Sequence, residues 1–339
     1  MTQEAVLAKD RRRIMNDTLI ERLRAIAPVK TDEPLARHTT FGIGGPADIF
    51  VTVRNASQLA DVVVAARAGG ARVFILGSGS NILVGDGGIR GVVIDNQAKA
   101  HVVAPLHIGD ASPVREPAYL ADVPADEKFV VSAESGGSFA ALARNLARRG
   151  YGGIEWAAGI PGTLGGAVVY NAGAYGGSLS DVLMAITLLG ASNEKLYLPL
   201  ADLRMAYRTS AILRGEYGAC VVLTVEFALR RRDPVELTRR IAELDAQRLA
   251  AQPRGRNSGS TFKNPAGDHA WRLIDAVRMR GMRIGDARVS EKHSNFFENL
   301  GNARATDVAA LMREAQRRVK EQFGIELQNE VEMVGEGFA

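Results

Sequence analysis

The chain has 339 residues, of which 46% are apolar and 24% charged, a balance typical of a globular protein with a substantial core. A net charge of +4 is too small for the basic surface of a nucleic-acid-binding protein. No uncharged apolar stretch reaches the about 18 residues that predict a membrane span. A single cysteine, Cys220, excludes an intrachain disulfide, and no His, Cys and Asp cluster with metal-site spacing is present, so we expect no metal. Without a secretory signal after the basic N-terminus, we expect a cytoplasmic protein.

The first 35 residues are polar and predict a partly helical lead-in. The segment that follows contains Gly42, Gly44 and Ala47 at the spacing of the dinucleotide-binding fingerprint. That fingerprint requires a helix next, whereas Asp48–Val53 alternates between polar and apolar residues and predicts a strand. The context therefore argues against a Rossmann fold.

The next elements alternate between helix and strand. Apolar residues at helical spacing predict a helix from Ser57 to Arg67, and a strand is expected over Val73–Leu76. The loop Gly77-Ser78-Gly79-Ser80-Asn81 then offers backbone N–H groups, hydroxyls and an amide suited to a phosphate, without the lysine of a P-loop. An ordinary hairpin turn explains this loop equally well.

Residues 97–128 lose all periodicity and predict a surface insertion or long loop. A helix capped by Ser138 and ended by Gly150 then leads into a glycine-rich stretch. Residues 152–177 contain nine of the 36 glycines of the chain, interleaved with apolar residues. Either tight turns between buried strands or close approach to a flat or phosphorylated ligand explains them, and composition does not choose between the two.

A strand over Ala219–Leu229 precedes the boundary that we expect near residue 231, where Asp233 and Pro234 have the pattern of a helix start. Beyond it we expect a short helix over Trp271–Arg278 and a long helix from Thr306 to Phe323. A last strand over Ile325–Met333 is predicted by its alternation, with Glu330 on the polar face.

Several motifs occur together and in one order: Gly77–Asn81, Gly159–Ala167 with Asn171–Ala174, Tyr207–Ser210, Gly259–Pro265 and Glu330-Val331. In these motifs the chain resembles the UDP-N-acetylenolpyruvoylglucosamine reductase (MurB) family. The resemblance covers residues 36–335. The resemblance implies an α+β protein. Residues 36–230 would form an FAD-binding domain of the vanillyl-alcohol-oxidase (PCMH) type, with the insertion at 97–128, and residues 231–339 a smaller α+β substrate-binding domain.

The resemblance also implies the chemistry of a UDP-N-acetylmuramate dehydrogenase in peptidoglycan synthesis. NADPH would reduce a tightly bound FAD, which would pass a hydride to the enolpyruvyl ether of a UDP-linked amino sugar. Arg208 and Glu330 would stabilise the resulting enolate, and Ser260 would donate the proton. Glu330 fits this role only if it is protonated or bridged by a donor, because a free carboxylate would repel the enolate. We add Lys263 as the hypothesised stabiliser of the Ser260 alkoxide.

By the same resemblance, the FAD would lie against fourteen residues: Gly42, Gly44, Gly45, Gly77, Ser78, Gly79, Ser80, Asn81, Gly159, Ile160, Pro161, Gly162, Gly165 and Gly166. The substrate candidates are Arg248, Lys263, Asn264 and His293. Arg248 has the weakest support, since Leu249-Ala250-Ala251 carries less charge than the family pattern. The interval from Tyr207 to Val225 is too short for the tyrosine-bearing lid of one family branch, so we expect the lidless branch. Neither nucleic acid nor an obligatory protein partner is expected.

Without the resemblance, these residues have ordinary explanations. Glu330 fits a solvated strand face, Arg208 a surface turn and Ser260 a turn sequence. Two other functions compete with the reductase. Another flavin oxidoreductase on the same fold is expected to lack the Gly-Ser-Thr-Phe-Lys-Asn motif and Glu330, and a catalytically inactive flavin- or nucleotide-binding module needs none of the three residues.

Overall fold

The structure is a computed structural model that describes residues 17–338. It begins with a helical segment at residues 17–24, and the rest of the expected N-terminal lead-in lies outside the described residues. A four-stranded sheet follows in the order β1-β2-β5-β3. Its elements are β1 (Val29–Pro34), the 3-10 helix Leu35–His38, β2 (Pro46–Val53), α2 (Ala56–Ala68), β3 (Val73–Leu76) and β5 (Ile89–Asn96).

Helix α2 crosses between β2 and β3, which both pair in parallel with β5. The Asn55 side chain accepts a hydrogen bond from Gln58 N at the start of the helix, and Gly69 is its C-cap. Leu59, Val62 and Val63 are buried against the sheet. The helix expected over Ser57–Arg67 is confirmed, and a strand follows the glycines of the fingerprint-like segment, as expected.

A second, six-stranded sheet has the order β12-β11-β13-β7-β6, with β8 pairing to β13. Its strands are β6 (His101–Pro105), β7 (Lys128–Glu134), β8 (Tyr151–Gly152), β11 (Leu183–Leu189), β12 (Lys195–Pro199) and β13 (Val221–Arg231). Buried side chains of β7, β11 and β13 form one core with α3 (Phe139–Arg148) and α4 (Leu164–Tyr170). The shorter elements of this region are the 3-10 helices Glu155–Gly159 and Leu179–Asp181, β9 (Gly173–Ala174), β10 (Gly177–Ser178) and α5 (Leu200–Leu203).

The segment 97–128 is not merely the surface loop that its sequence predicts. It contributes β6, which pairs antiparallel with β7 at the edge of the second sheet, and two 3-10 turns at Ala118–Leu120 and Ala125–Glu127. Leu120 is fully buried and the Tyr119 hydroxyl donates to Ala228 O over 2.7 Å. The strand was missed because its exposure alternates over only a few residues before Pro105 ends it.

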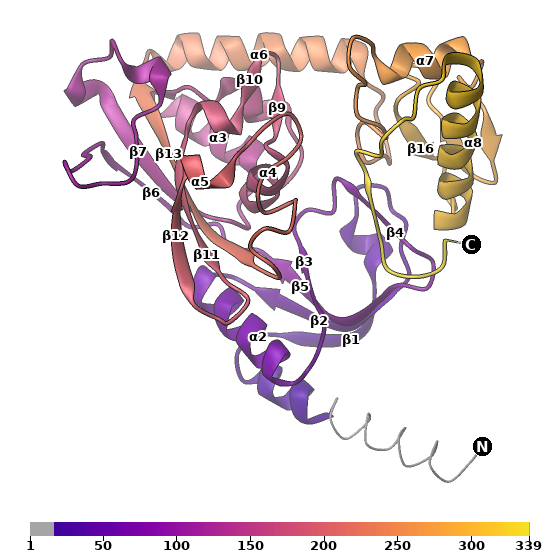
Figure 1. The fold of residues 1–339 in the computed structure, drawn as a ribbon, viewed down its shortest axis with the longest axis horizontal. Coiled ribbons are helices and arrows are strands. Elements are labelled where there is room, and N and C mark those ends of the chain that lie inside the picture. The colour runs from indigo at the N-terminus through magenta and orange to yellow at the C-terminus, as the bar shows by residue number, and fades with distance from the viewer. Residues whose placement is uncertain (1–16, 339) are drawn as a thin grey trace.

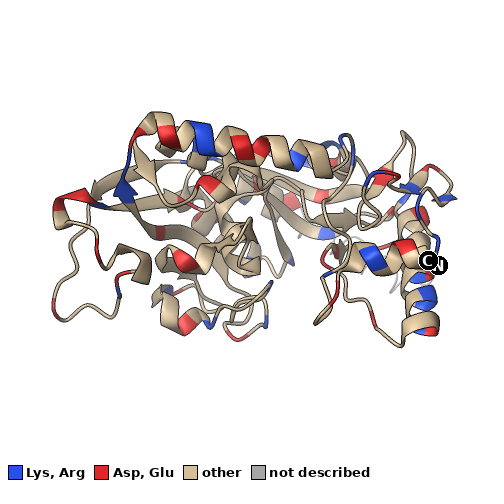
Figure 2. Ribbon diagram, turned by 90° about the horizontal axis from the view of Figure 1, so that it is seen from above, with Lys and Arg blue, Asp and Glu red and all other residues tan. Residues whose placement is uncertain are grey.

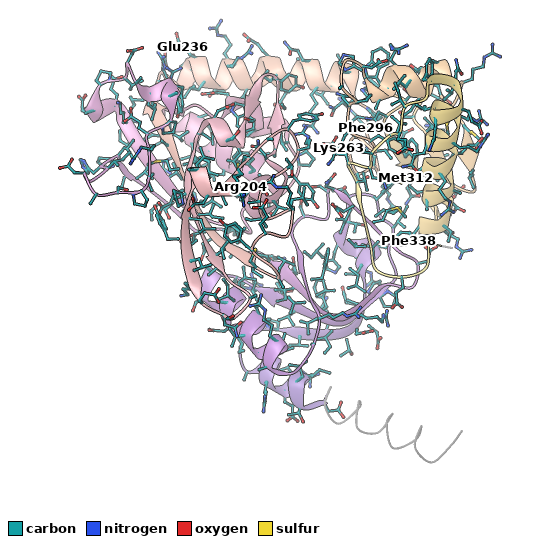
Figure 3. All side chains as sticks on the ribbon, viewed as in Figure 1. Arg204, Glu236, Lys263, Phe296, Met312 and Phe338 are labelled. Carbon is teal, nitrogen blue, oxygen red and sulfur yellow. The ribbon has the colours of Figure 1, made fainter. Side chains whose placement is uncertain are left out.

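Helix α6 (Pro234–Ala251) connects the second sheet to the C-terminal part of the chain and spans the top of the molecule in Figure 1. The Asp233 side chain caps it and Pro234 occupies its first turn, as expected. The C-terminal part then contains α7 (Ala270–Ala276), β14 (Arg283–Ile284), β15 (Ala287–Val289), β16 (Phe297–Asn299) and α8 (Ala305–Phe323). Met312, labelled in Figure 3, lies in the core that α8 forms with α7 and the three strands.

The C-terminus returns to the first part of the chain, where β17 (Glu332–Val334) pairs in parallel with β4 (Ile82–Val84). The strand expected over Ile325–Met333 is therefore wrong in extent, because residues 325–328 are not in a strand and Asn329 forms only an isolated bridge with Phe262. Helix α8 begins at Ala305 rather than after a Thr306 cap. Its first N–H groups donate to the carboxylate of Asp86, between β4 and β5.

The two expected domains are closely joined. Phe41, Ile43 and Leu83 lie in the C-terminal core, while Leu237 and Ile241 of α6 lie in the core of the second sheet. The boundary near residue 231 stays a prediction. Charged residues of both signs are interspersed along α6 in Figure 2. Within residues 17–338, no helix is long and apolar enough to cross a membrane.

Candidate active site

A cavity of about 460 Å³ lies between the glycine-rich segments and the C-terminal part of the chain. One wall contains the loop Gly77–Asn81, the segment Ile160–Gly166 and the end of α4. The C-terminal part contributes Ser258–Ser260, Phe296, Glu330, Glu332 and Val334, and Glu332 N donates to Asn81 O beside the loop. Figure 3 labels Phe296 and Lys263 on the side of the C-terminal part that faces α4. The cavity thus lies where the motifs of distant sequence segments meet.

The loop Gly77–Asn81 lines this cavity along its whole length. Gly79 has a φ of 60°, and a Cβ there would lie 2.2 Å from His38 O, so the protein itself requires glycine. The Ser80 hydroxyl donates to Pro161 O over 3.2 Å, which connects the two glycine-rich segments. The Asn81 amide donates to Glu330 O over 3.0 Å, so this side chain holds the segment of Glu330 in addition to lining the cavity.

The second glycine-rich segment contributes Ile160, Pro161, Gly162, Gly165 and Gly166 to the wall. Gly165 N donates to Ser135 O over 2.7 Å. Because a Cβ on Gly165 would lie 3.0 Å from the Ser135 Cβ, glycine lets the start of α4 pack against the end of β7. Packing within the protein therefore accounts for glycine at 165, and the approach of a ligand to this segment stays a prediction.

Four of the expected cofactor-binding glycines, Gly42, Gly44, Gly45 and Gly159, are not among the residues that line the cavity. A Cβ on Gly44 would lie 2.8 Å from the Val84 Cβ, and one on Gly45 would lie 2.3 Å from Asp86 O. Gly42 and Gly159 face arginine side chains, those of Arg256 and Arg248. At these positions, contacts within the protein already account for glycine.

All three expected catalytic residues, Arg208, Ser260 and Glu330, line the cavity. Arg208 Nε lies 2.6 Å from Glu330 Oε1, and the exposed fractions of the two side chains are only 23% and 15%. The Arg208 guanidinium also donates to Gly173 O over 3.0 Å. Arg208 has a φ of 52° in the tight turn closed by Ala206 and Thr209, so its backbone is held in an uncommon conformation.

Burial is the largest influence on the Glu330 carboxyl and raises its pKa, while the positive charges of Arg208 and Lys263 act in the opposite direction. The buried Nε of Arg208 is thus occupied by its contact with Glu330 Oε1. The pair places a guanidinium and a carboxyl whose ionisation burial disfavours side by side on the cavity wall.

The two residues that follow Ser260 are held in place by Asn295. The Asn295 amide accepts from Phe262 N over 2.9 Å and donates to Phe262 O over 2.8 Å, while Asn295 O accepts from Thr261 N. Ser260 itself forms a β-bridge with Phe296. The serine motif is therefore fixed against the segment that contains His293, rather than being a free turn.

The expected substrate residues divide into one that lines the cavity and three that do not. Arg248, the candidate with the weakest sequence support, lines it, and burial lowers the pKa of its guanidinium. No carboxylate among residues 17–338 forms an ion pair with Arg248. It is a half-buried cation available for an anion.

Lys263, Asn264 and His293 are absent from the cavity wall. Lys263 is near enough to Glu330 to influence its pKa. The Asn264 side chain accepts from Ala270 N at the start of α7, and the His293 ring packs against Phe296. Burial lowers the His293 pKa, as expected for a structural histidine.

Sequence reasoning missed several polar cavity residues, among them Asn96, Ser135, Tyr170 and Glu332. The Asn96 amide donates to Ser135 Oγ over 2.9 Å, and both residues are buried. Asn96 ends β5 and Ser135 directly follows β7, and these strands belong to different sheets, so no local pattern predicts the contact. For Tyr170, its place one residue before the motif Asn171–Ala174 was an available signal.

Comparison with known proteins agrees with this geometry. The family model "UDP-N-acetylenolpyruvoylglucosamine reductase, C-terminal domain" matches residues 251–334, and an FAD-binding domain model matches residues 47–194. The UDP-N-acetylenolpyruvoylglucosamine reductase of Agathobacter rectalis is 40% identical over 327 residues, covering 95% of this chain and 100% of that protein. The chain belongs to the UDP-N-acetylenolpyruvoylglucosamine reductase family.

Other members of the reductase family show the same extent of similarity. The protein of Rubrobacter xylanophilus is 38% identical, covering 95% of this chain and 100% of its own length. The crystal structure of the reductase from Thermus caldophilus superposes with a TM-score of 0.69 at 33% identity, covering 91% of this chain and 99% of that one. The expected fold class, an FAD-binding domain followed by the C-terminal domain of this reductase family, is confirmed.

Proposed function

We propose that the chain is a UDP-N-acetylmuramate dehydrogenase, which reduces the enolpyruvyl ether of UDP-N-acetylglucosamine enolpyruvate in peptidoglycan synthesis. Family membership over nearly the whole chain supports this activity. The observation that carries the residue assignments is the cavity that unites Arg208, Ser260 and Glu330 with two glycine-rich segments. A substrate linked to a uridine nucleotide suits a cytoplasmic enzyme, and no obligatory protein partner is proposed.

The cavity residues fit FAD. Apolar side chains line one region of the cavity, including Phe74, Ile75 and Val222, and glycines with hydroxyl groups line another. The apolar region suits an aromatic ring system, and the loop Gly77–Asn81 with Ile160–Gly166 would hold the polar linker. When bound, FAD takes a hydride from NADPH and delivers it to the substrate alkene.

Arg208 and Glu330 would hold the substrate carboxylate, where negative charge develops during the reduction. A fixed donor aimed at developing charge lowers the barrier most effectively in a site shielded from water. Arg208 supplies the positive charge, on a guanidinium that lines the cavity. Because burial raises the Glu330 pKa, this carboxyl is biased toward the protonated form in which it assists an enolate.

The Ser260 hydroxyl would protonate the remaining carbanion, since Ser260 lies on the same cavity wall as Glu330. Lys263 stays a hypothesis as the stabiliser of the alkoxide, because its side chain is not part of the wall. For the anionic diphosphate of the substrate, Arg248 is the strongest candidate on the cavity surface. Asn264 and His293 would act at a distance, by ordering the C-terminal part.

The decisive experiment follows the flavin absorbance of the purified protein under anaerobic conditions. NADPH should bleach a yellow protein, and UDP-N-acetylglucosamine enolpyruvate should restore the colour without oxygen. Re-oxidation by oxygen alone would favour a flavin oxidase instead. A colourless protein that takes up no FAD would contradict the cofactor assignment of the glycine-rich segments.

Ser260→Ala tests the proton donor in the same experiment. We expect bleaching by NADPH to proceed at the wild-type rate, while re-oxidation by the substrate falls on the order of 10²–10⁴-fold. Equal loss of both half-reactions would argue against this role for Ser260.

A further inference from the structure

The two members of the Arg208–Glu330 pair come from distant parts of the chain. Arg208 occupies the tight turn closed by Ala206 and Thr209, whereas Glu330 lies just before β17. Backbone contacts that fix the position of one residue therefore do not by themselves fix the position of the other. A short segment at the C-terminal end of α4, residues 170–173, nevertheless contacts the supports of both.

Toward Arg208, the contacts are made by Asn171 and Gly173. Asn171 is buried, with only 6% of its surface exposed, and has a left-handed backbone with a φ of 44°. Its side-chain amide donates to Ala206 O over 3.0 Å, at the start of the turn, and Gly173 O accepts from the Arg208 guanidinium over 3.0 Å. This part of the segment fixes both the backbone and the side chain of Arg208.

Toward Glu330, the contact is made by Tyr170. Its side chain and that of Glu332 both line the cavity, and the tyrosine hydroxyl is near enough to the Glu332 carboxylate for that carboxylate to raise the tyrosine pKa. Glu332 begins β17, and its backbone N–H donates to Asn81 O over 3.0 Å. The Asn81 amide in turn donates to Glu330 O, so the tyrosine reaches the strand start that positions Glu330.

Tyr170 is not suited to donate a proton itself. Burial is the largest cause that raises its pKa, and the nearby Glu332 carboxylate raises it further. Because its hydroxyl lies near Glu332 at the start of β17, we expect its effect on the reaction to run through the position of β17. Asn171 has no titratable group and is engaged with Ala206 and Ser180.

We propose that Tyr170 and Asn171 are positioning residues that hold Glu330 and Arg208 at the mutual distance that enolate stabilisation requires. The inference rests on the proposed function, because it assigns a supporting role to that same site. Displacement of a catalytic group by a fraction of an ångström lowers the rate without preventing ligand binding. The two residues should therefore affect the half-reaction in which the enolate forms.

Tyr170→Phe and Asn171→Asp test the two sides separately. Tyr170→Phe removes only the hydroxyl, and Asn171→Asp keeps the shape and the acceptor for Ser180 N while it replaces the donor to Ala206 O with an oxygen. In anaerobic stopped-flow experiments, we expect reduction of the flavin by NADPH to stay within about twofold of the wild type. Re-oxidation by UDP-N-acetylglucosamine enolpyruvate should slow by about tenfold or more in each variant.

Tyr197→Phe is the matched control. Tyr197 on β12 donates to a glutamate, with its hydroxyl 2.8 Å from Glu226 Oε2, but it does not line the cavity. Removing this hydroxyl should leave both half-reactions unchanged. If Tyr170→Phe takes up no FAD, Glu332→Ala, which removes the carboxylate near the tyrosine hydroxyl, replaces it in the comparison, with the same expected effect.

The outcomes separate the inference from the proposed function. If the wild-type enzyme is not re-oxidised by the substrate, the proposed function fails. If the wild type is re-oxidised and the variants match it, only the positioning role fails. A slower reduction by NADPH or an altered flavin spectrum in Tyr170→Phe would place the tyrosine against the cofactor and would also overturn the inference.

Discussion

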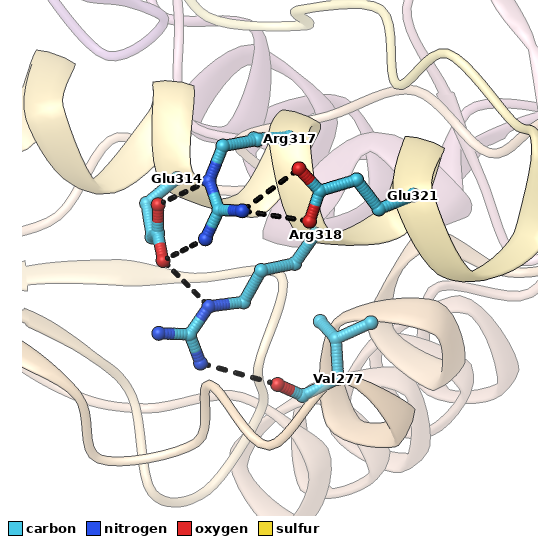
Figure 4. A network of polar contacts seen from close by, with 5 residues as sticks. All are labelled: Val277, Glu314, Arg317, Arg318 and Glu321. Carbon is cyan, nitrogen blue, oxygen red and sulfur yellow. Dashed lines mark hydrogen bonds and ion pairs between the residues drawn. The ribbon is translucent and has the colours of Figure 1, made fainter.

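Glu330 and Glu314 both pair with arginine, yet the pKa of each carboxyl shifts in the opposite direction. At Glu314, on the surface of α8, hydrogen bonds from Arg317 and Arg318 lower the pKa to about 2. Figure 4 shows this network, in which Arg317 also contacts Glu321. At Glu330, burial outweighs the attraction of Arg208 and raises the pKa.

The two pKa shifts differ in direction because the carboxyls differ in their exposure to water, not because their partners differ. Water stabilises an ionised carboxylate at the surface, where two arginines add to that effect. In the cavity, the loss of hydration disfavours the charge more than one arginine favours it. The surface network is therefore suited to stability, while the cavity pair retains a carboxyl and a guanidinium whose charges respond to a ligand.

The largest effect should come from breaking the cavity pair at its arginine. Arg208→Met removes the cation that would face the enolate, so re-oxidation of the flavin by substrate should fall on the order of 10²–10³-fold. Arg317→Met breaks the surface network and should leave both half-reactions unchanged. Similar activity losses in the two variants would contradict the distinction between the pairs.

Breaking the same pair at its carboxyl should separate activity from stability. Glu330→Gln is expected to slow re-oxidation by about 10²-fold, because an amide is a poorer partner for the enolate. Since folding raises the Glu330 pKa, the contribution of this group to the free energy of unfolding is largest at low pH. It is lost as the pH rises above 4.5.

Glutamine does not titrate, so the Tm of Glu330→Gln relative to that of the wild type should increase from about pH 5 to about pH 8. Thermal melts across this range measure the trend. A relative Tm that decreases with pH would mean that Arg208, rather than burial, dominates at this carboxyl.

Arg248 extends the comparison to a cavity cation without a carboxylate partner. Arg248→Met should raise the KM for the UDP-linked substrate by about tenfold or more, because a charge-assisted hydrogen bond is lost. The kcat should change less. Arg240→Met on the same helix is the control, since Arg240 is exposed and pairs with Glu243. An unchanged KM in Arg248→Met would remove Arg248 from the substrate site.

The sequence predicted the helices whose first residues are set by a capping side chain nearby in the sequence. Helices α2, α3 and α6 begin close to the expected residues because Asn55, Ser138 and Asp233 cap them within a few residues. In contrast, α8 begins against the carboxylate of Asp86, which is far away in the sequence. The position of its first residue therefore depends on the tertiary fold.

Within the candidate site, the resemblance placed Arg208, Ser260 and Glu330 correctly on one cavity. It could not distinguish a glycine that faces a ligand from one that packs against the protein itself, because neither position has room for a Cβ. Gly45 is a glycine of the second kind. The proximity of Tyr170 and Glu332 was also out of reach, since the two residues are far apart in the sequence and meet only at the folded cavity.

The smallest effect is expected at the surface network. Because folding lowers the Glu314 pKa to about 2 from 4.5, its contribution to stability is present above pH 4.5 and is lost as the pH falls toward 2. Exposure and salt screen such pairs, so Glu314→Gln should cost about 1 kcal/mol or less near neutral pH. Thermal melts at low ionic strength should show a small decrease in Tm that vanishes in acid or in about 0.5 M salt. A loss that persists in high salt would mean that Glu314 acts through packing, and the contrast with Glu330 would then no longer be one of solvent.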